Sequence, residues 1–127
     1  MLKLGEIYRG KVAYRKNNVY HPLVCLEDET NAKTTIDACV LTHSLCGMSY
    51  QNIPMKKEHF LENDEQGNPY SFKFENTCMV QNAFEKELFW IDDKCIGKLS
   101  QEGIDFVLQN SRPFGPAIKY PKPLQGK

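Results

Sequence analysis

Short apolar runs separated by polar turns dominate this chain, and their length is typical of β-strands. Two runs stand out, residues 21–26 and 36–44, and a charged connector of residues 27–33 joins them. Strand-length apolar runs joined by a polar turn predict a pair of adjacent strands. In such a pair His21 and Thr42 stand at opposite strand ends, and they lie side by side at one edge of the sheet.

The chain before and after this pair predicts further strands. Residues 4–14 are rich in β-forming side chains, and Gly10 within them indicates a bulge or a close approach of another backbone. Pro22 has no N–H to donate, so the second strand is expected to begin near Leu23 with His21 at its mouth. Shorter strands are expected at residues 53–55, 71–74 and 77–80, and the apolar run 88–91 is expected to face the core.

One helix is predicted close to the C-terminus. Ser100 is a good N-cap, and Leu99 before it is placed to contact Ile104. Ile104, Val107 and Leu108 then share one helical face, and the helix is expected to end near residue 110. The four prolines of residues 111–127 predict a flexible or extended tail.

These elements predict one domain over residues 1–110, followed by a basic tail over 111–127. Five to seven short strands with one C-terminal helix indicate a mainly β fold, namely a small and strongly bent barrel.

Composition limits the cellular locations and metal sites that we expect for the protein. No apolar run approaches the roughly 20 residues of a membrane-spanning helix, and the first residues lack the apolar core of a signal peptide. The five cysteines are widely spaced, with no pair two residues apart, so a metal site built from them is not expected. We therefore expect a cytoplasmic protein without membrane contact, whose cysteines, such as Cys25 and Cys39, are reduced and buried.

Charge is balanced in total but uneven along the chain. The sequence has 16 basic and 16 acidic residues, yet residues 1–26 hold five basic side chains against one acid, and residues 111–127 hold no acid. A basic surface able to meet a phosphate backbone is compatible with this pattern. The zero total argues against a nucleic-acid binder that relies on charge alone.

Four short motifs, in their order and spacing, resemble the PemK/MazF family of toxin endoribonucleases from bacterial toxin–antitoxin systems. They are Gly5-Glu6-Ile7, His21-Pro22-Leu23-Val24-Cys25-Leu26, Val40-Leu41-Thr42 and Gly97-Lys98-Leu99-Ser100, and the resemblance covers roughly residues 4–110. It implies an SH3-like barrel that forms a homodimer and holds single-stranded RNA in a groove at the dimer interface. It also implies cleavage without metal or other cofactor, and inhibition by a cognate antitoxin protein.

The resemblance also assigns roles to individual residues. The second strand of the family opens with Arg-Pro, and that arginine is catalytic; here the position is His21. The threonine that ends the third strand of the family is present as Thr42. Arg9, Arg15 and Lys16 are then the candidates to bind RNA and supply positive charge.

Cleavage of RNA without metal uses the adjacent 2′-hydroxyl as nucleophile and needs a base, an acid and charge stabilisation. An arginine stabilises charge but shuttles protons poorly, whereas histidine titrates near neutrality. We therefore expect His21 to act in proton transfer and Thr42 to donate a hydrogen bond to a phosphate oxygen. The plainer alternatives are a half-buried structural histidine, a threonine that bonds the backbone, and a solvated basic turn at Arg15 and Lys16.

Three functions stay open on the sequence. The first is the endoribonuclease toxin, and the second is an inactive barrel of the same family that binds nucleic acid or protein. The third is an interaction module that recognises protein only. Of the other histidines, His43 is expected on the opposite face from Thr42, and His59 is expected in solvent beside an acidic loop.

Overall fold

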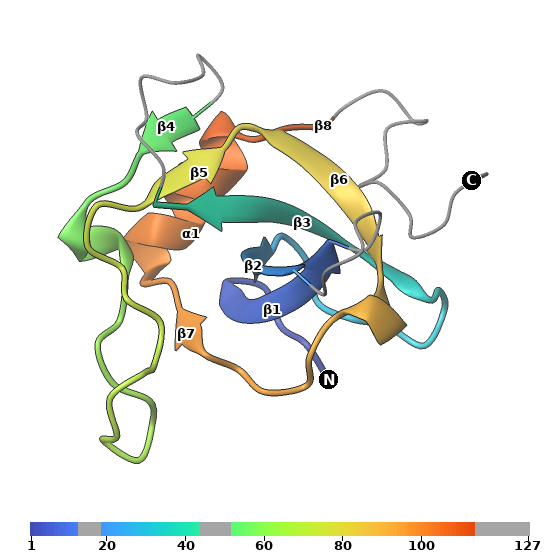
Figure 1. The fold of residues 1–127 in the computed structure, drawn as a ribbon, viewed down its shortest axis with the longest axis horizontal. Coiled ribbons are helices and arrows are strands. Elements are labelled where there is room, and N and C mark those ends of the chain that lie inside the picture. Colours follow the sequence, from blue (N-terminus) through green and yellow to red (C-terminus); the bar gives the residue numbers. More distant parts are fainter. Residues whose placement is uncertain (13–18, 44–51, 114–127) are drawn as a thin grey trace.

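The computed structural model describes residues 1–12, 19–43 and 52–113 and shows a mainly β fold with one C-terminal helix (Figure 1). The strands are β1 (Glu6–Val12), β2 (Val19–Cys25), β3 (Thr35–Thr42), β4 (Asn52–Pro54), β5 (Cys78–Val80), β6 (Asn82–Glu87), β7 (Gly97–Lys98) and β8 (Arg112–Pro113). Two 3-10 turns, η2 (Lys57–His59) and η3 (Leu88–Trp90), and the helix α1 (Gln101–Asn110) complete the described elements. The predicted fold class is confirmed.

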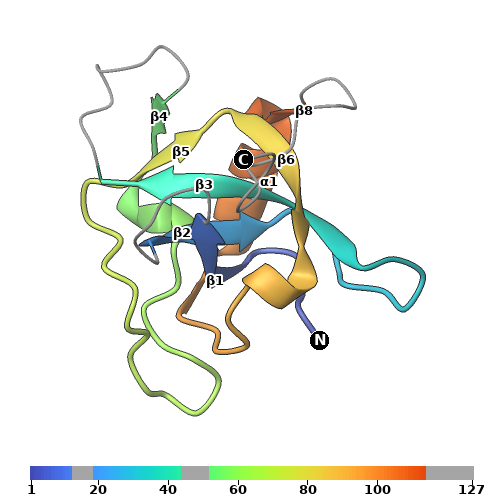
Figure 2. The same cartoon turned by 45° about the vertical axis from the view of Figure 1, so that its right-hand side comes forward.

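The strands form one bent sheet in the order β4-β5-β3-β2-β1-β7, and β6 pairs with β3 and β8. All pairs are antiparallel except β6 with β8. The long strand β3 holds the sheet together, because its first half pairs with β6 and its last two residues pair with β5. Figure 2 shows β6 curving away from β8 towards η3, which gives the sheet its barrel-like bend.

Apolar side chains are buried on both faces of this sheet. On one face a cluster that includes Ile7, Val24, Leu41 and Met79 packs against Val107 of α1. On the other face two smaller clusters form around Leu23 and around Tyr8. Strands buried on both faces explain why β2 and β3 have nearly continuous apolar runs.

The helix begins and ends as the sequence predicts. Ser100 caps it, because its Oγ accepts a hydrogen bond from Gly103 N–H at 3.1 Å. Val107 is fully buried and Ile104 packs against the same cluster, whereas Leu108 is 46% exposed. The buried face therefore runs through Gly103 and Val107, and the expectation for Leu108 was wrong.

Past the helix, Arg112 and Pro113 pair in parallel with Asn82 and Ala83. The sheet thus extends beyond the domain boundary that the sequence predicts at residue 110. Residues 114–127, which make up most of the predicted tail, lie outside the described residues.

Two expectations for the middle of the chain were wrong, and a third holds in part. Residues 71–74 form no strand. Leu88 and Ile91 pack against buried clusters as expected, but residues 88–90 form a 3-10 turn in which Phe89 is 75% exposed. His59 is buried, because its ring stacks on Phe106 with centroids 4.3 Å apart and its Nδ1 accepts the Lys56 N–H at 2.9 Å.

Candidate functional site

β2 begins at Val19, so the expectation that the strand begins near Leu23 with His21 at its mouth was wrong. His21 lies within the strand, because β2 pairs with β1 through Pro22, and it stands opposite a residue without a side chain. It is half-buried in β2, and its cross-strand partner in β1 is Gly10. A Cβ at Gly10 would stand 2.1 Å from Leu23 Cδ1, so the Leu23 side chain already fills the space above Gly10. Leu23, which shares a face with His21, therefore lies directly against the Gly10 backbone. Burial lowers the pKa of His21 below its ordinary value, and the imidazole is neutral at pH 7.

Thr42 is the last residue of β3 and is also half-buried. The β2–β3 ladder pairs Cys25 with Ala38, Val24 with Cys39 and Leu23 with Val40, where it ends. Continued by two residues, the same register sets His21 opposite Thr42. Side chains two residues apart in a strand share a face, so both face the same side as Leu23 and Val40.

Past the end of this ladder the two strands keep different neighbours. β2 continues beside β1, whereas Leu41 and Thr42 pair with Met79 and Cys78 of β5. Pro22 has no N–H to extend the ladder with β3. The ends of β2 and β3 thus lie on the same face of the sheet without a continuous hydrogen-bond ladder between them.

Arg9 does not join this pair. It is opposite Pro22 in β1 and alternates with Tyr8 and Gly10, so its side chain faces the other side of the sheet from His21. It is exposed, and its carbonyl accepts the Asp92 N–H at 2.8 Å. Arg15 and Lys16, the other two predicted RNA-binding residues, lie outside the described residues.

His43, directly after Thr42, faces the opposite side as expected. Its ring stacks on Phe72 with centroids 5.7 Å apart, and its Nε2 is within hydrogen-bond distance of the Lys73 carbonyl. Phe72 belongs to the large cluster under α1. These two contacts of His43 hold the segment around residue 73 against the end of β3.

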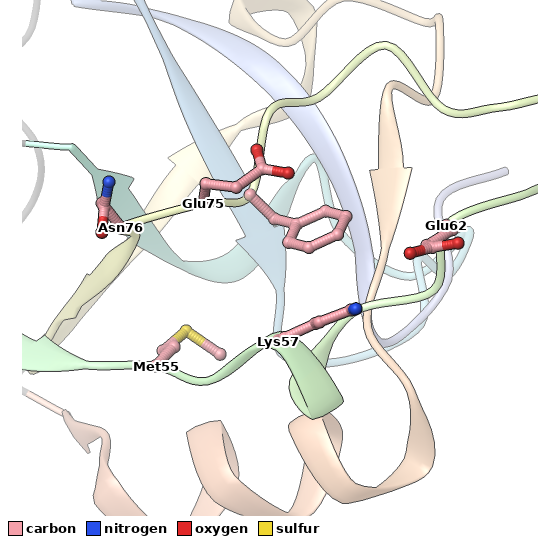
Figure 3. Close-up of a pocket in the computed structure, with 6 residues that line it drawn as sticks. Met55, Lys57, Glu62, Glu75 and Asn76 are labelled. Atoms are coloured by element: carbon pink, nitrogen blue, oxygen red, sulfur yellow. The ribbon is translucent and has the colours of Figure 1, made fainter.

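That segment borders an open pocket of about 480 Å³ that sequence reasoning missed. It is lined by Met55, Lys57, Glu62, Phe74, Glu75 and Asn76. Figure 3 shows Glu75 and Asn76 on one segment, Met55 and Lys57 on the facing segment, and Glu62 at one end. Asn76 has φ 59°, a left-handed conformation that asparagine tolerates better than most residues. No short motif marks these positions, because segments distant in the sequence come together there.

The cysteines among the described residues fall into two groups. Cys25, Cys39 and Cys95 are free thiols, and burial raises the pKa of Cys39 to about 12. Cys78, which pairs with Thr42, is disulfide-bonded, contrary to the expectation of reduced cysteines throughout. Reactivity is therefore low at the buried thiol of Cys39.

Within the described ranges, no three His, Cys, Asp or Glu side chains gather as metal ligands do. The same part of the chain holds no helix that is long and apolar enough to cross a membrane.

Fold and site together define a small barrel-like β domain whose candidate residues are His21, the third residue of β2, and Thr42, the last residue of β3. Comparison with protein families, with curated proteins and with solved structures found no match for this chain. The assignment to the PemK/MazF family remains a hypothesis that rests on the motif residues.

Proposed function

We propose that the protein is an endoribonuclease toxin that cleaves single-stranded RNA without a metal ion. The observation that supports the proposal is the β2–β3 pairing, which ends at Leu23 and Val40. Counted on by two residues along each strand, that register would bring His21 opposite Thr42 on one face. These are the two positions at which the PemK/MazF resemblance has its catalytic arginine and threonine.

Proton transfer is the role of His21 in this proposal. A neutral imidazole accepts the proton of a ribose 2′-hydroxyl, and the 2′-oxygen attacks the adjacent phosphorus. The bond from phosphorus to the 5′-oxygen then breaks, and the leaving oxygen takes up a proton from water, while His21 returns its proton to the solvent. The products are a 2′,3′-cyclic phosphate and a 5′-hydroxyl. Because burial lowers the pKa of His21, the base is in its reactive form at neutral pH.

Thr42 supports the phosphate in this scheme. Its hydroxyl donates a hydrogen bond to a non-bridging oxygen, where negative charge develops in the transition state. The positive charge comes from Arg15 or Lys16 rather than Arg9, because Arg9 faces the other side of the sheet. As the resemblance implies, the protein acts as a homodimer and is held inactive by a cognate antitoxin. A cytoplasmic location is the separate expectation from composition.

The test is cleavage of a mixed-sequence RNA by purified protein in the presence of a chelator. We expect products that end in 2′,3′-cyclic phosphate and 5′-hydroxyl, and we expect their loss in His21→Ala with the circular dichroism spectrum unchanged. If the RNA stays intact after incubation with the correctly folded parent protein, the proposal is wrong.

A second function is favoured by the placement of Arg9. If no cation stands beside His21, the barrel binds nucleic acid or a protein partner without cleaving. Binding of intact RNA that weakens as salt rises then replaces cleavage as the expected result.

A further inference from the structure

We propose that the pocket formed by Met55, Lys57, Glu62, Phe74, Glu75 and Asn76 binds an amino-bearing nucleobase of single-stranded RNA. This inference rests on the proposed function for its ligand, and it assigns a recognition site separate from His21 and Thr42. Its volume of about 480 Å³ is within the range of small-molecule sites, and Figure 3 shows polar groups on more than one side.

An aromatic platform lines the pocket. Phe74 is half-buried and stacks on Phe60, with ring centroids 5.2 Å apart and an interplanar angle of 10°. Phe60 is itself buried in the large cluster, so Phe74 is held against a fixed support. Unstacked bases of single-stranded RNA bind by stacking on aromatic side chains of this kind.

Acceptors predominate among the polar groups. Glu62 and Glu75 are exposed carboxylates, and neither forms an ion pair with another described residue. Asn76 adds an amide that both donates and accepts. Carboxylates accept hydrogen bonds from the amino groups of adenine, cytosine and guanine, whereas uracil has no amino group. The lining therefore favours amino-bearing bases over uracil.

The charges of the lining partly offset one another. Lys57 offsets one of the two carboxylates, so the remaining negative charge attracts a lysine or arginine of a protein partner only modestly. The preference for a base comes from the Phe74 ring, and the Lys57 ammonium can meet a neighbouring phosphate. With one cation and two carboxylates, binding here should depend little on salt.

The pocket lies beside the end of β3 at Thr42, on the other face of the sheet from the Thr42 side chain. Thr42, Cys78 and Pro54 stand side by side across β3, β5 and β4. Asn76 precedes Cys78 by two residues, and Met55 follows Pro54 and donates its N–H to the Thr77 carbonyl at 2.9 Å. Met55 and Phe74 pack against the large cluster under α1, whereas Thr42 faces the side of Leu23. An RNA strand therefore reaches both sites only by passing round the ends of β3 and β5.

The experiment is an NMR titration of the isotope-labelled protein with 2′-O-methyl RNA hexamers of adenine, cytosine or uracil. These oligomers lack the 2′-hydroxyl nucleophile and stay intact. We expect the amide signals of Lys57, Phe74, Glu75 and Asn76 to shift with the adenine and cytosine hexamers. The uracil hexamer should bind about three- to tenfold more weakly, the effect of one hydrogen bond.

Two variants separate a base site from a general change of the protein. Phe74→Leu keeps apolar volume but removes the ring, and it should weaken binding of the adenine hexamer at least about fivefold. Phe89→Leu is the matched control, because Phe89 is 75% exposed on η3 and does not line the pocket. Asn76→Gly removes the amide while keeping a residue that accepts a positive φ, so it should weaken binding without loss of stability.

The outcomes distinguish this inference from the proposed function. Pocket shifts in a protein that cuts no RNA support the base site and overturn the nuclease. Cleavage without pocket shifts, or equal binding of all three hexamers, overturns the base site and leaves the nuclease standing. Shifts produced by a lysine-rich peptide and by no RNA also overturn it, since they indicate a protein partner.

Discussion

The carbonyl oxygen of His59 lies 2.1 Å from the point that a Cβ on Gly103 would occupy. The same oxygen accepts the Ser100 N–H at 2.9 Å, so the start of α1 rests directly on the backbone of η2. Gly103 is therefore the residue that permits this contact, although glycine is unfavourable within a helix.

Gly103→Ala should lower the free energy of unfolding by about 1–3 kcal/mol, because the added methyl group forces backbone apart and outweighs the gain in helix propensity. Chemical denaturation followed by circular dichroism measures the change. Gln101→Ala, at an exposed position in the same helix, is the control and should be neutral or slightly stabilising. Equal stability of Gly103→Ala and the parent contradicts the contact.

His59 should make the protein less stable in mild acid. Burial lowers the pKa of His59, and Glu102, Lys56 and Glu58 have smaller effects on it. In mild acid the unfolded chain therefore binds a proton at His59 more readily than the folded protein does. Stability is therefore full above about pH 6.5 and falls as the pH drops from there towards the folded pKa. His59→Asn retains an acceptor for the Lys56 N–H but does not titrate. The free energy of unfolding of His59→Asn should fall less between about pH 7 and pH 5 than that of the parent. An equal loss in the two proteins contradicts the prediction.

Thr77 offers a substitution that should stabilise. Its side chain is 1% exposed, and its hydroxyl has no hydrogen-bond partner among the described residues. Thr77→Val keeps the shape and removes the buried polar group, so the free energy of unfolding should rise by about 1 kcal/mol. Thr35→Val is the contrasting variant. Thr35 Oγ1 donates a hydrogen bond to Glu85 Oε2 at 3.2 Å, so this variant should be less stable than the parent. Destabilisation of Thr77→Val shows that the hydroxyl does have a partner.

The three basic candidates should behave differently in cleavage. Arg9→Gln should leave the rate at saturating RNA within about twofold, because a side chain on the opposite face of the sheet adds no charge beside His21. Arg15→Gln or Lys16→Gln should lower that rate by about tenfold or more if it removes a stabilising cation. Single-turnover kinetics measures all three. A large loss in Arg9→Gln alone shows that the cation comes from β1.

The parts of the fold that the sequence predicted are those with a clear apolar pattern. β2 and β3 have strand-length apolar runs, and α1 has both a cap at Ser100 and a buried face around Val107. β6 was missed because it is mostly polar, with only Ala83 and Phe84 apolar, yet Lys86 is 3% exposed within it. Burial lowers the pKa of Lys86 to about 8, an effect that tertiary packing alone decides.

The sequence likewise predicts only part of the candidate site. The end of β3 at Thr42 follows from the local apolar pattern, but the start of β2 does not, because the strand begins at Val19 and continues through Pro22. The roles of His21 and Thr42 come from the PemK/MazF resemblance. The orientation of Arg9 depends on its register with Pro22, which no local pattern determines. The pocket beside Asn76 depends on how residues 55–62 and 74–76 meet in space, and only the folded chain specifies that.

The most direct test of the central claim is the pH dependence of RNA cleavage without metal, compared between the parent, His21→Ala and His21→Arg. If His21 acts as the base, the rate of the parent rises with pH and levels off with a midpoint below about pH 6.5, because burial lowers its pKa. His21→Ala should lose at least about 100-fold in rate, and His21→Arg should lose that midpoint. Full activity of a folded His21→Ala, or a parent rate with no such midpoint, contradicts the claim.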